Sequence, residues 1–258
     1  MRFFWLFPLT LWAQYQVPRL LALAGTQAAL SGDPLSANPA SAFPASQWQI
    51  STGSAFYILT PELSYHTIGI AFRIDTVQAL SLIGHYWGFD KLSHLHGGLG
   101  YAMRLLRGQI TLSVRGRFLH TNLQEYGQVS HLTPDIGLLW QVSPRFRVGG
   151  YGFNLLGRGW GRMPGNAAYG IGLSYEPSAQ VQLLSEVHQS ERGPWAVHTA
   201  LAYRPVSLLI LRMGIAAPLL QVGGGFSIAY KRLTLDFGYR YYPTIGSWAG
   251  AGLTYPAP

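Results

Sequence analysis

The chain has 258 residues, of which 48% are hydrophobic and only 11% are charged. Soluble domains carry about 25% charged residues, so this composition indicates that much of the surface does not face water. The sequence contains no cysteine, which excludes disulfides and thiol chemistry, and its net charge of +8 comes from dispersed basic residues, which argues against nucleic-acid binding.

The first residues have the pattern of an export signal. Met1 to Ala13 (MRFFWLFPLTLWA) combines one early arginine with an apolar run and a small residue at its end. This pattern predicts a secretory signal peptide over residues 1–13, cut before Gln14. The rest of the chain has no run of about 18 apolar residues, so we expect no transmembrane helix.

Residues 14–47 differ in composition from the sequence that follows. Leu20 to Leu30 is rich in alanine and leucine and favours a short helix, while the prolines after it prevent a continued helix or a strand ladder. A disordered tether should be polar, whereas this stretch carries apolar surface that is unfavourable in water. We therefore predict that 14–47 is a plug-like segment inserted into the structure formed by residues 48–258, either as a seal or as a gate. A tether before the first strand is the alternative.

From Trp48 onward, apolar residues alternate with polar or small ones. In Leu233 to Tyr242 (LTLDFGYRYY), the odd-numbered positions are all apolar or aromatic, as expected for a strand with one apolar face. We count about fourteen such segments, of a length suited to tilted membrane strands of roughly 9–11 residues. The sequence therefore predicts an all-β fold, a transmembrane antiparallel β-barrel over residues 48–258.

The connections between these segments are expected to alternate in length. Tight turns are predicted around 143–145, 176–179, 205–206 and 231–232, and long loops over Thr121 to Leu132 and Leu156 to Gly165. An export signal on a strand-rich chain indicates the outer membrane of a Gram-negative bacterium. Its surroundings would then be outer-membrane lipid and lipopolysaccharide.

Several motifs follow one another in an order that resembles a known family. The first is a small-residue helix followed by Asp33 and by Asn38-Pro39-Ala40, and the second is a Pro-Asp and glycine-rich strand pair over Thr133 to Gly157. The stretches VQLLSEVHQ and LLILRMGIA follow them. In this order they resemble the PorV/PorQ-like outer-membrane proteins of Bacteroidetes-type bacteria, a family that is similar to FadL-type hydrophobic-solute transporters. The resemblance implies a fourteen-stranded barrel and, for some members, a role in type IX secretion or surface attachment.

Charged residues on the inward phase predict a polar network in the barrel lumen. An arginine or lysine facing lipid at the midplane costs about 2–4 kcal/mol, and charges placed inside should pair to limit the cost of desolvation. For Arg240 we predict a partner in Asp236 or in a carboxylate of a neighbouring strand such as Glu186. The predicted network consists of Arg115, Arg117, Asp135, Glu186, His188, Arg212, Asp236 and Arg240.

No pattern in the sequence indicates catalysis, a cofactor or a metal site. His94 and His96 point the same way in a strand, but two histidines without a third ligand form a weak metal signal. Ser185 lies on the opposite phase from His188, so we expect no hydrolase and no enzyme activity. Two functions stay open. One is a non-enzymatic component of the PorV/PorQ kind with a secretion-system or surface protein partner. The other is a FadL-like channel with a hydrophobic small-molecule ligand, which a continuous apolar cavity would favour.

Overall fold

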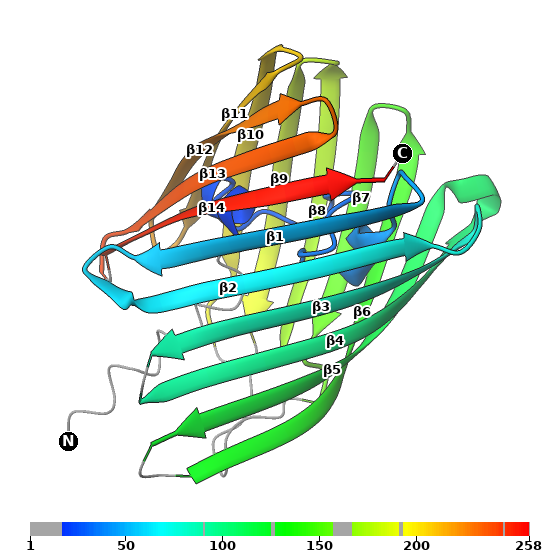
Figure 1. Cartoon of the computed structure of the whole chain (residues 1–258). Helices are drawn as coiled ribbons and strands as arrows, with labels where there is room; N and C mark the ends of the chain where they lie inside the picture. The colour runs from blue at the N-terminus through cyan, green and yellow to red at the C-terminus, as the bar shows by residue number, and fades with distance from the viewer. Residues whose placement is uncertain are drawn as a thin grey trace.

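The structure is a computed structural model that describes residues 17–89, 91–124, 127–156, 167–190, 193–244 and 246–257. The predicted signal peptide, residues 1–13, lies outside the described residues. Within those ranges, no helix has both the length and the apolar character needed to cross a membrane. Fourteen strands form one closed barrel, in which every strand pairs antiparallel with its sequence neighbours and β1 pairs with β14 (Figure 1).

The predicted fold class is thereby confirmed. The strands are β1 (Trp48–Tyr57), β2 (Thr60–Arg73), β3 (Gln78–Phe89), β4 (Leu92–Leu105), β5 (Ile110–Leu123), β6 (Gly127–Ser143), β7 (Phe146–Phe153), β8 (Ala168–Ser178), β9 (Val181–Ser190), β10 (Ala196–Val206), β11 (Leu209–Ala217), β12 (Gln221–Tyr230), β13 (Leu233–Tyr242) and β14 (Gly246–Pro256). A short 3-10 turn, η4 (Leu106–Gly108), joins β4 to β5.

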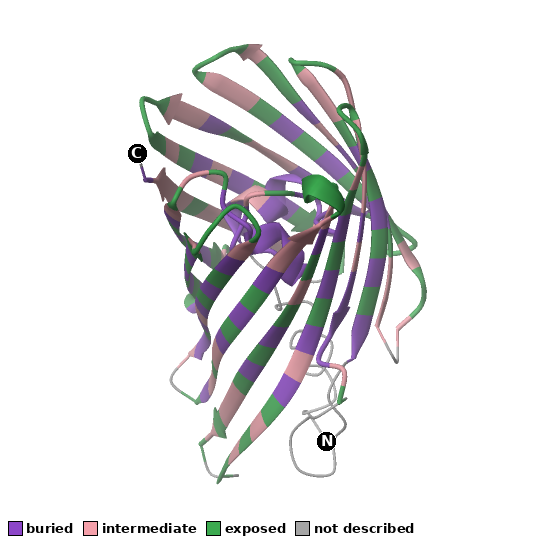
Figure 2. Cartoon of the chain, turned by 90° about the vertical axis from the view of Figure 1, so that its right-hand side faces the viewer, coloured by how far each residue is buried: buried purple, intermediate pink, exposed green. Residues whose placement is uncertain are grey.

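Side chains alternate between the lumen and the outer face along each strand, which gives the striped burial pattern of Figure 2. On β13, Asp236 and Arg240 are buried, whereas Leu235 is 39% and Tyr239 is 42% exposed. An apolar outer face is what a barrel wall in lipid requires, since polar groups cannot be solvated there. The alternation predicted from Leu233 to Tyr242 therefore has the correct phase.

The barrel wall is taller on one side. β6 has 17 residues, whereas β7 has 8. The long loop predicted over Thr121 to Leu132 is wrong, because β5 continues to Leu123 and β6 already begins at Gly127. At about 3.3 Å per residue, β6 is longer than a bilayer needs, so its first residues can be polar and still form a strand in water. The other predicted loop, Leu156 to Gly165, falls almost entirely outside the described residues.

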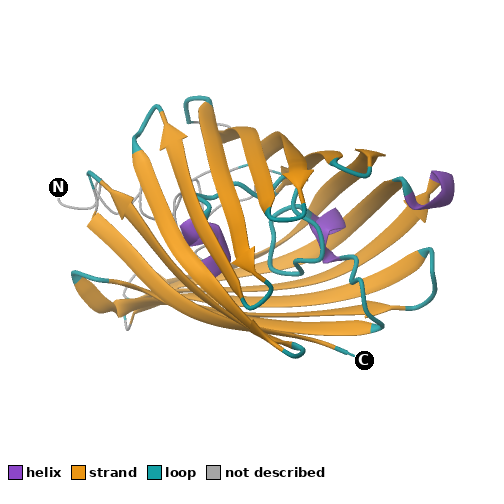
Figure 3. Cartoon of the chain, turned by 90° about the horizontal axis from the view of Figure 1, so that it is seen from above, coloured by secondary structure: helices purple, strands orange, loops and turns teal. Residues whose placement is uncertain are grey.

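Residues 17–44, which we call the plug segment, lie inside the barrel (Figure 3). The segment contains α2 (Pro18–Ala22) and the 3-10 helix η3 (Pro39–Ala42). The helix is shorter than the predicted Leu20 to Leu30, because Ala24 and Gly25 adopt positive φ angles of 49° and 87° that an α-helix cannot continue through. The leucines of this stretch are buried in the lumen, which removes their apolar surface from water.

Glycines at inward positions let the plug segment lie against the wall. A Cβ at Gly149 on β7 would clash with the carbonyl oxygen of Ala28, and one at Gly238 on β13 would clash with that of Pro18. Backbone atoms cannot move aside as a flexible side chain can, so these positions need glycine. The glycines whose added Cβ would meet backbone or side-chain atoms of the plug segment are Gly53, Gly69, Gly137, Gly149, Gly172, Gly214, Gly223, Gly225, Gly238 and Gly252.

Candidate functional site

One buried carboxylate organises the contact between the plug segment and the β5–β6 wall. Asp135 accepts from Arg115 Nε at 3.0 Å and from Arg117 Nη2 at 2.7 Å, and all three side chains are essentially inaccessible. Arg115 is the direct cross-strand neighbour of Asp135. It also donates to the plug carbonyls of Ser36 at 3.3 Å and Ala37 at 3.0 Å. This cluster therefore joins the β5–β6 wall to the plug backbone through the hydrogen bonds of Arg115.

The motif residues Asp33, Asn38, Pro39 and Ala40 fold the plug segment and attach it to the same wall. The amide of Asn38 donates to the carbonyl oxygens of Ala28 at 2.6 Å and of Leu138 on β6 at 3.0 Å. Its Oδ1 accepts from Ala40 N, which caps η3, with Pro39 in the first turn where no backbone donor is needed. Asp33 closes a turn by accepting from Leu35 N at 3.0 Å.

A second charged cluster lies on β11 to β13. Arg212 Nη1 donates to Asp236 Oδ1 at 3.1 Å, and Ser227 between them hydrogen-bonds both side chains. Arg19 of α2 lies 4.0 Å from Asp236 and 3.5 Å from Asp33. Burial alone would lower the pKa of Arg19, but the attraction of these two carboxylates outweighs it and raises the pKa, so the side chain stays charged.

The β9–β10 wall holds the plug segment by a few hydrogen bonds to its backbone, without an ion pair among the described residues. Glu186 Oε2 accepts from the backbone N–H groups of Gln27 and Ala28, both at 2.7 Å, and its Oε1 accepts from Tyr151 at 2.9 Å. His198 Nδ1 donates to the carbonyl oxygen of Ala24 at 2.8 Å. His188 lies on the other side of the Tyr151 hydroxyl, at 3.0 Å. Glu186 thus has three donors, none of them an arginine.

Arg240 faces the lumen, but its contacts differ from the predicted ones. Its Nη2 donates to Gln221 on β12, and its Cζ lies 5.0 Å from the ring centroid of Tyr242. Asp236 is occupied by Arg212, and Glu186 binds the plug backbone. Four residues along a strand separate Asp236 from Arg240 by about 13 Å, too far for direct pairing. Among the described residues, no carboxylate forms an ion pair with Arg240 within 4.0 Å.

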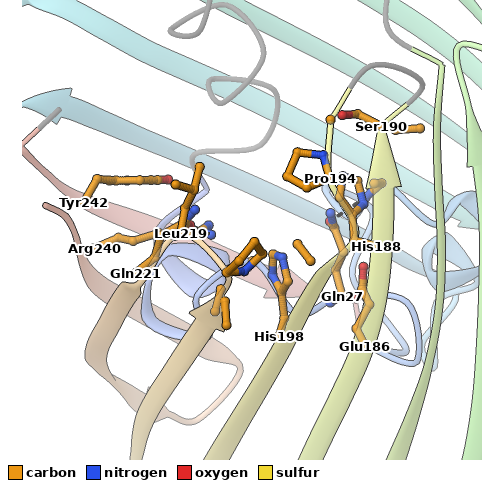
Figure 4. Close-up of a pocket in the computed structure, with 18 of the residues that line it drawn as sticks. Gln27, Glu186, His188, Ser190, Pro194, His198, Leu219, Gln221, Arg240 and Tyr242 are labelled. Atoms are coloured by element: carbon orange, nitrogen blue, oxygen red, sulfur yellow. Dashed lines mark hydrogen bonds between the residues drawn. The ribbon is translucent and has the colours of Figure 1, made fainter. Parts of the chain in front are cut away.

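A cavity of about 320 Å³ lies beside Arg240, between the plug segment and the β7–β13 wall (Figure 4). Apolar side chains such as Phe153, Ala168 and Leu219 form much of its lining. Its polar lining is concentrated in the side chains of Gln27, Glu186, His188, Ser190, His198, Gln221 and Arg240. The connections from β9 to β10 and from β11 to β12 border it, so it opens toward that end of the barrel.

A second cavity, of about 260 Å³, lies on the other side of the plug segment. It is bordered by the β8–β9 turn and by polar side chains such as Arg19, Glu176 and Arg204. Gly25 and Gln27 line the first cavity, while Leu23 and Leu30 line the second. Residues 23–30, which we call the plug strip, therefore separate two cavities along one side of the lumen.

Sequence reasoning identified the inward charges but missed several neutral polar residues of the site. Tyr151, His198 and Gln221 all lie on inward phases, and that phase was the only signal available for them. The structure also brings His85 of β3 next to His96, with ring centroids 6.5 Å apart. Even so, no three His, Asp or Glu side chains in the described part of the chain are placed to hold a metal ion.

Comparisons with known proteins show the fold. No protein-family model and no curated protein sequence matches the chain. The toluene transporter TbuX of Ralstonia pickettii superposes with a TM-score of 0.67 at 14% identity, over 94% of this chain and 97% of that one. The toluene transporter TodX of Pseudomonas putida gives 0.68 at 10% identity, over 92% and 96%. A FadL homologue of Pseudomonas aeruginosa gives 0.62 at 11%, over 92% and 96%.

The class that these comparisons define is the fourteen-stranded Gram-negative outer-membrane β-barrel. Within that class, this chain has the FadL-type fold of the toluene transporters, with the N-terminal segment inside the barrel. Outer-membrane localisation, predicted from the strand pattern, agrees with this fold. The comparisons support the predicted likeness to FadL-type barrels. They give no support for the predicted likeness to the PorV/PorQ group.

Proposed function

We propose that this protein is a non-enzymatic outer-membrane channel for small, largely apolar organic molecules. The observation that carries the proposal is the 320 Å³ cavity, which lies in the lumen and joins apolar walls to a few convergent polar groups. Binding sites for small molecules have this composition, and typical ones measure about 300–1,000 Å³. The toluene transporters that share the fold support the same class of solute.

The two cavities give the proposed route a direction. A solute that enters the first cavity reaches the plug strip, and the second cavity lies beyond it toward the end that carries the β8–β9 turn. Glu186 and His198 hold this strip by hydrogen bonds to its backbone. Movement of residues 23–30 would join the cavities, whereas the rest of the plug segment could stay in place.

A secretion or attachment component of the PorV/PorQ kind is the second candidate, and its support is the order of the sequence motifs. Asn38, Pro39 and Ala40 fold the plug and fix it to β6, a role that any plugged barrel could use. A sealed lumen would have favoured this candidate. The cavity beside the plug strip favours the channel instead.

The proposal is tested by filling the cavity. Ala216 on β11 is 2% exposed and lines the first cavity, whereas Ala251 on β14 faces outward. In a Gram-negative host lacking other hydrocarbon channels, Ala216→Phe should reduce the initial rate of toluene uptake to that of cells without the protein, and Ala251→Phe should leave it unchanged. Uptake no faster with the intact protein than without it would refute the channel.

A further inference from the structure

The buried arginines of the lumen differ in one respect. Arg115 and Arg117 share Asp135, and Arg212 pairs with Asp236. Arg240 is equally buried, at 6% exposure, yet within the described residues it has no carboxylate partner. An unpaired buried charge is costly, and native structures normally compensate it with a counter-charge or with good hydrogen bonds.

The hydrogen bonds of Arg240 do not replace that counter-charge. One Nη donates to the neutral side chain of Gln221, while the Nε is buried and has no hydrogen-bond partner among the described residues. Among the described residues that line the cavity, the acidic one is Glu186, which already accepts from two backbone N–H groups and from Tyr151. The guanidinium therefore keeps donor capacity that this wall does not use.

Arg240 borders the first cavity, where a ligand could supply the missing charge. Figure 4 shows Arg240 and Gln221 at one side of the cavity, with His198 between them and Glu186. Gly25 of the plug strip lies so close that a Cβ there would be 2.8 Å from Arg240 Nη1. The polar side of the cavity is thus a guanidinium fixed by Gln221 and the plug strip.

The rest of the cavity suits a compact apolar body. Phe153, Ala168 and Leu219 contribute apolar surface, and the plug strip closes the far end. A volume of about 320 Å³ is at the lower end of the range for ligand sites. A molecule of about one ring with a small substituent fits within this volume.

We propose that the first cavity selects a small carboxylic acid with a ring-sized apolar body, whose carboxylate pairs with Arg240. A guanidinium binds a carboxylate with two parallel charge-assisted hydrogen bonds, which Arg240 can offer through its two Nη groups because its Nε is inaccessible. The inference rests on the proposed function and names the solute class of that same cavity. It also accounts for the absence of a carboxylate partner of Arg240 among the described residues, where Arg115, Arg117 and Arg212 each contact an aspartate.

The test compares a charged ligand with its neutral isostere on the full folded chain in detergent micelles. Calorimetric titration should show benzoate binding at least about tenfold more tightly than benzamide, since the two differ mainly in the charge that Arg240 would meet. Arg240→Gln should remove this preference by weakening benzoate, with benzamide changed less than about twofold. Arg204→Gln, the same change at an exposed arginine of the second cavity, is the matched control and should keep the preference.

Each outcome decides the inference. Equal affinities for benzoate and benzamide, an undiminished preference in Arg240→Gln, or displacement of benzoate by palmitate at lower concentration would overturn it. If Arg240→Gln does not fold, the preference of the intact protein and that of Arg240→Lys, which keeps the charge, decide in its place. Toluene uptake without any preference for benzoate would remove this inference alone, whereas absence of both uptake and binding would remove the proposed function as well.

Discussion

The plug segment meets the barrel wall differently on its two sides. At β5 and β6, Asp135 pairs with two arginines, and Arg115 extends from that cluster to two plug carbonyls. At β9 to β13, the plug strip is held by three backbone hydrogen bonds, two accepted by Glu186 and one donated by His198, and a cavity lies on each side of it. We call the β5–β6 side the anchor side and the β9–β13 side the passage side. The sequence does not distinguish them, because both carry charged residues at inward positions of the strands.

The difference also concerns charge balance. On the anchor side, each of the two buried arginines contacts the carboxylate of Asp135. The passage side leaves Arg240 without a carboxylate among the described residues, and it leaves open space beside that arginine. Mutations on the anchor side should therefore affect folding most, and those on the passage side should affect conduction.

The largest effect is expected at the centre of the anchor. Asp135→Asn leaves Arg115 and Arg117 buried without a carboxylate, and breaking a buried pair costs about 3–5 kcal/mol. The temperature at which the folded band disappears in a heat-modifiability gel should fall sharply. Glu62→Gln removes an exposed carboxylate and should leave that temperature unchanged. Equal stability of the Asp135 variant and the parent would show that this side is no anchor.

Expelling the plug strip is the next test. A Cβ at Gly149 would clash with backbone atoms of Ala28, while one at the adjacent Gly150 meets nothing nearer than 3.6 Å. Gly149→Ala should cost about 1–3 kcal/mol through overpacking and raise ion conductance in planar bilayers. Gly150→Ala places the same methyl group on the opposite face and should conduct like the parent. Matching conductances for the two variants would contradict the seating of the strip on β7.

A milder change should loosen the strip without expelling it. Glu186→Gln weakens the charge-assisted hydrogen bonds to Gln27 and Ala28, which are worth about 1.5–3 kcal/mol for a charged acceptor. Hydrogen exchange of peptides from residues 23–30 should become faster, whereas exchange around η3 should not. Glu176→Gln, at a carboxylate 40% exposed and 3.9 Å from Arg147, is the control. Uniformly faster exchange across the plug segment would mean that both sides are held together as one unit.

The smallest effect is expected for Arg19→Gln. The Arg19 side chain is 25% exposed, its two carboxylate contacts are long, and Asp236 keeps Arg212 as a partner. Partly exposed ion pairs of this kind contribute about 0–1 kcal/mol. The heat-modifiability temperature should shift only slightly. A loss comparable to that of Asp135→Asn would place a second anchor at α2.

The sequence was sufficient for the architecture, because period-two alternation reports directly which face of a strand meets lipid. It predicted that Arg212, Asp236 and Arg240 face the lumen, since phase follows from position along a strand. It could not predict their partners, because pairing depends on the register between strands. Register sets Arg115 opposite Asp135, and it brings Arg212 to Asp236 across β12.

Two other differences have local causes. The stretch from Thr121 to Leu132 reads as a loop because it is polar, yet a strand that extends beyond the bilayer has water on both faces and can be polar as well. The helix predicted from Leu20 onward ends at Ala22, because the chain turns at Ala24 and Gly25 to follow the curved wall. Amino-acid composition does not show where a strand leaves the bilayer, nor how the barrel wall curves around the plug segment.

The position of Pro18 has a consequence for how the molecule assembles. Its ring and carbonyl pack at Gly53 of β1, Gly238 of β13 and Gly252 of β14, so α2 lies across the seam where the first and last strands meet. Contacts between distant parts of a chain form late in folding. The seam can therefore close only when the last strand arrives, and α2 in place at that moment would contact the strands on both sides of the seam. The plug segment thus contacts both strands whose pairing closes the barrel.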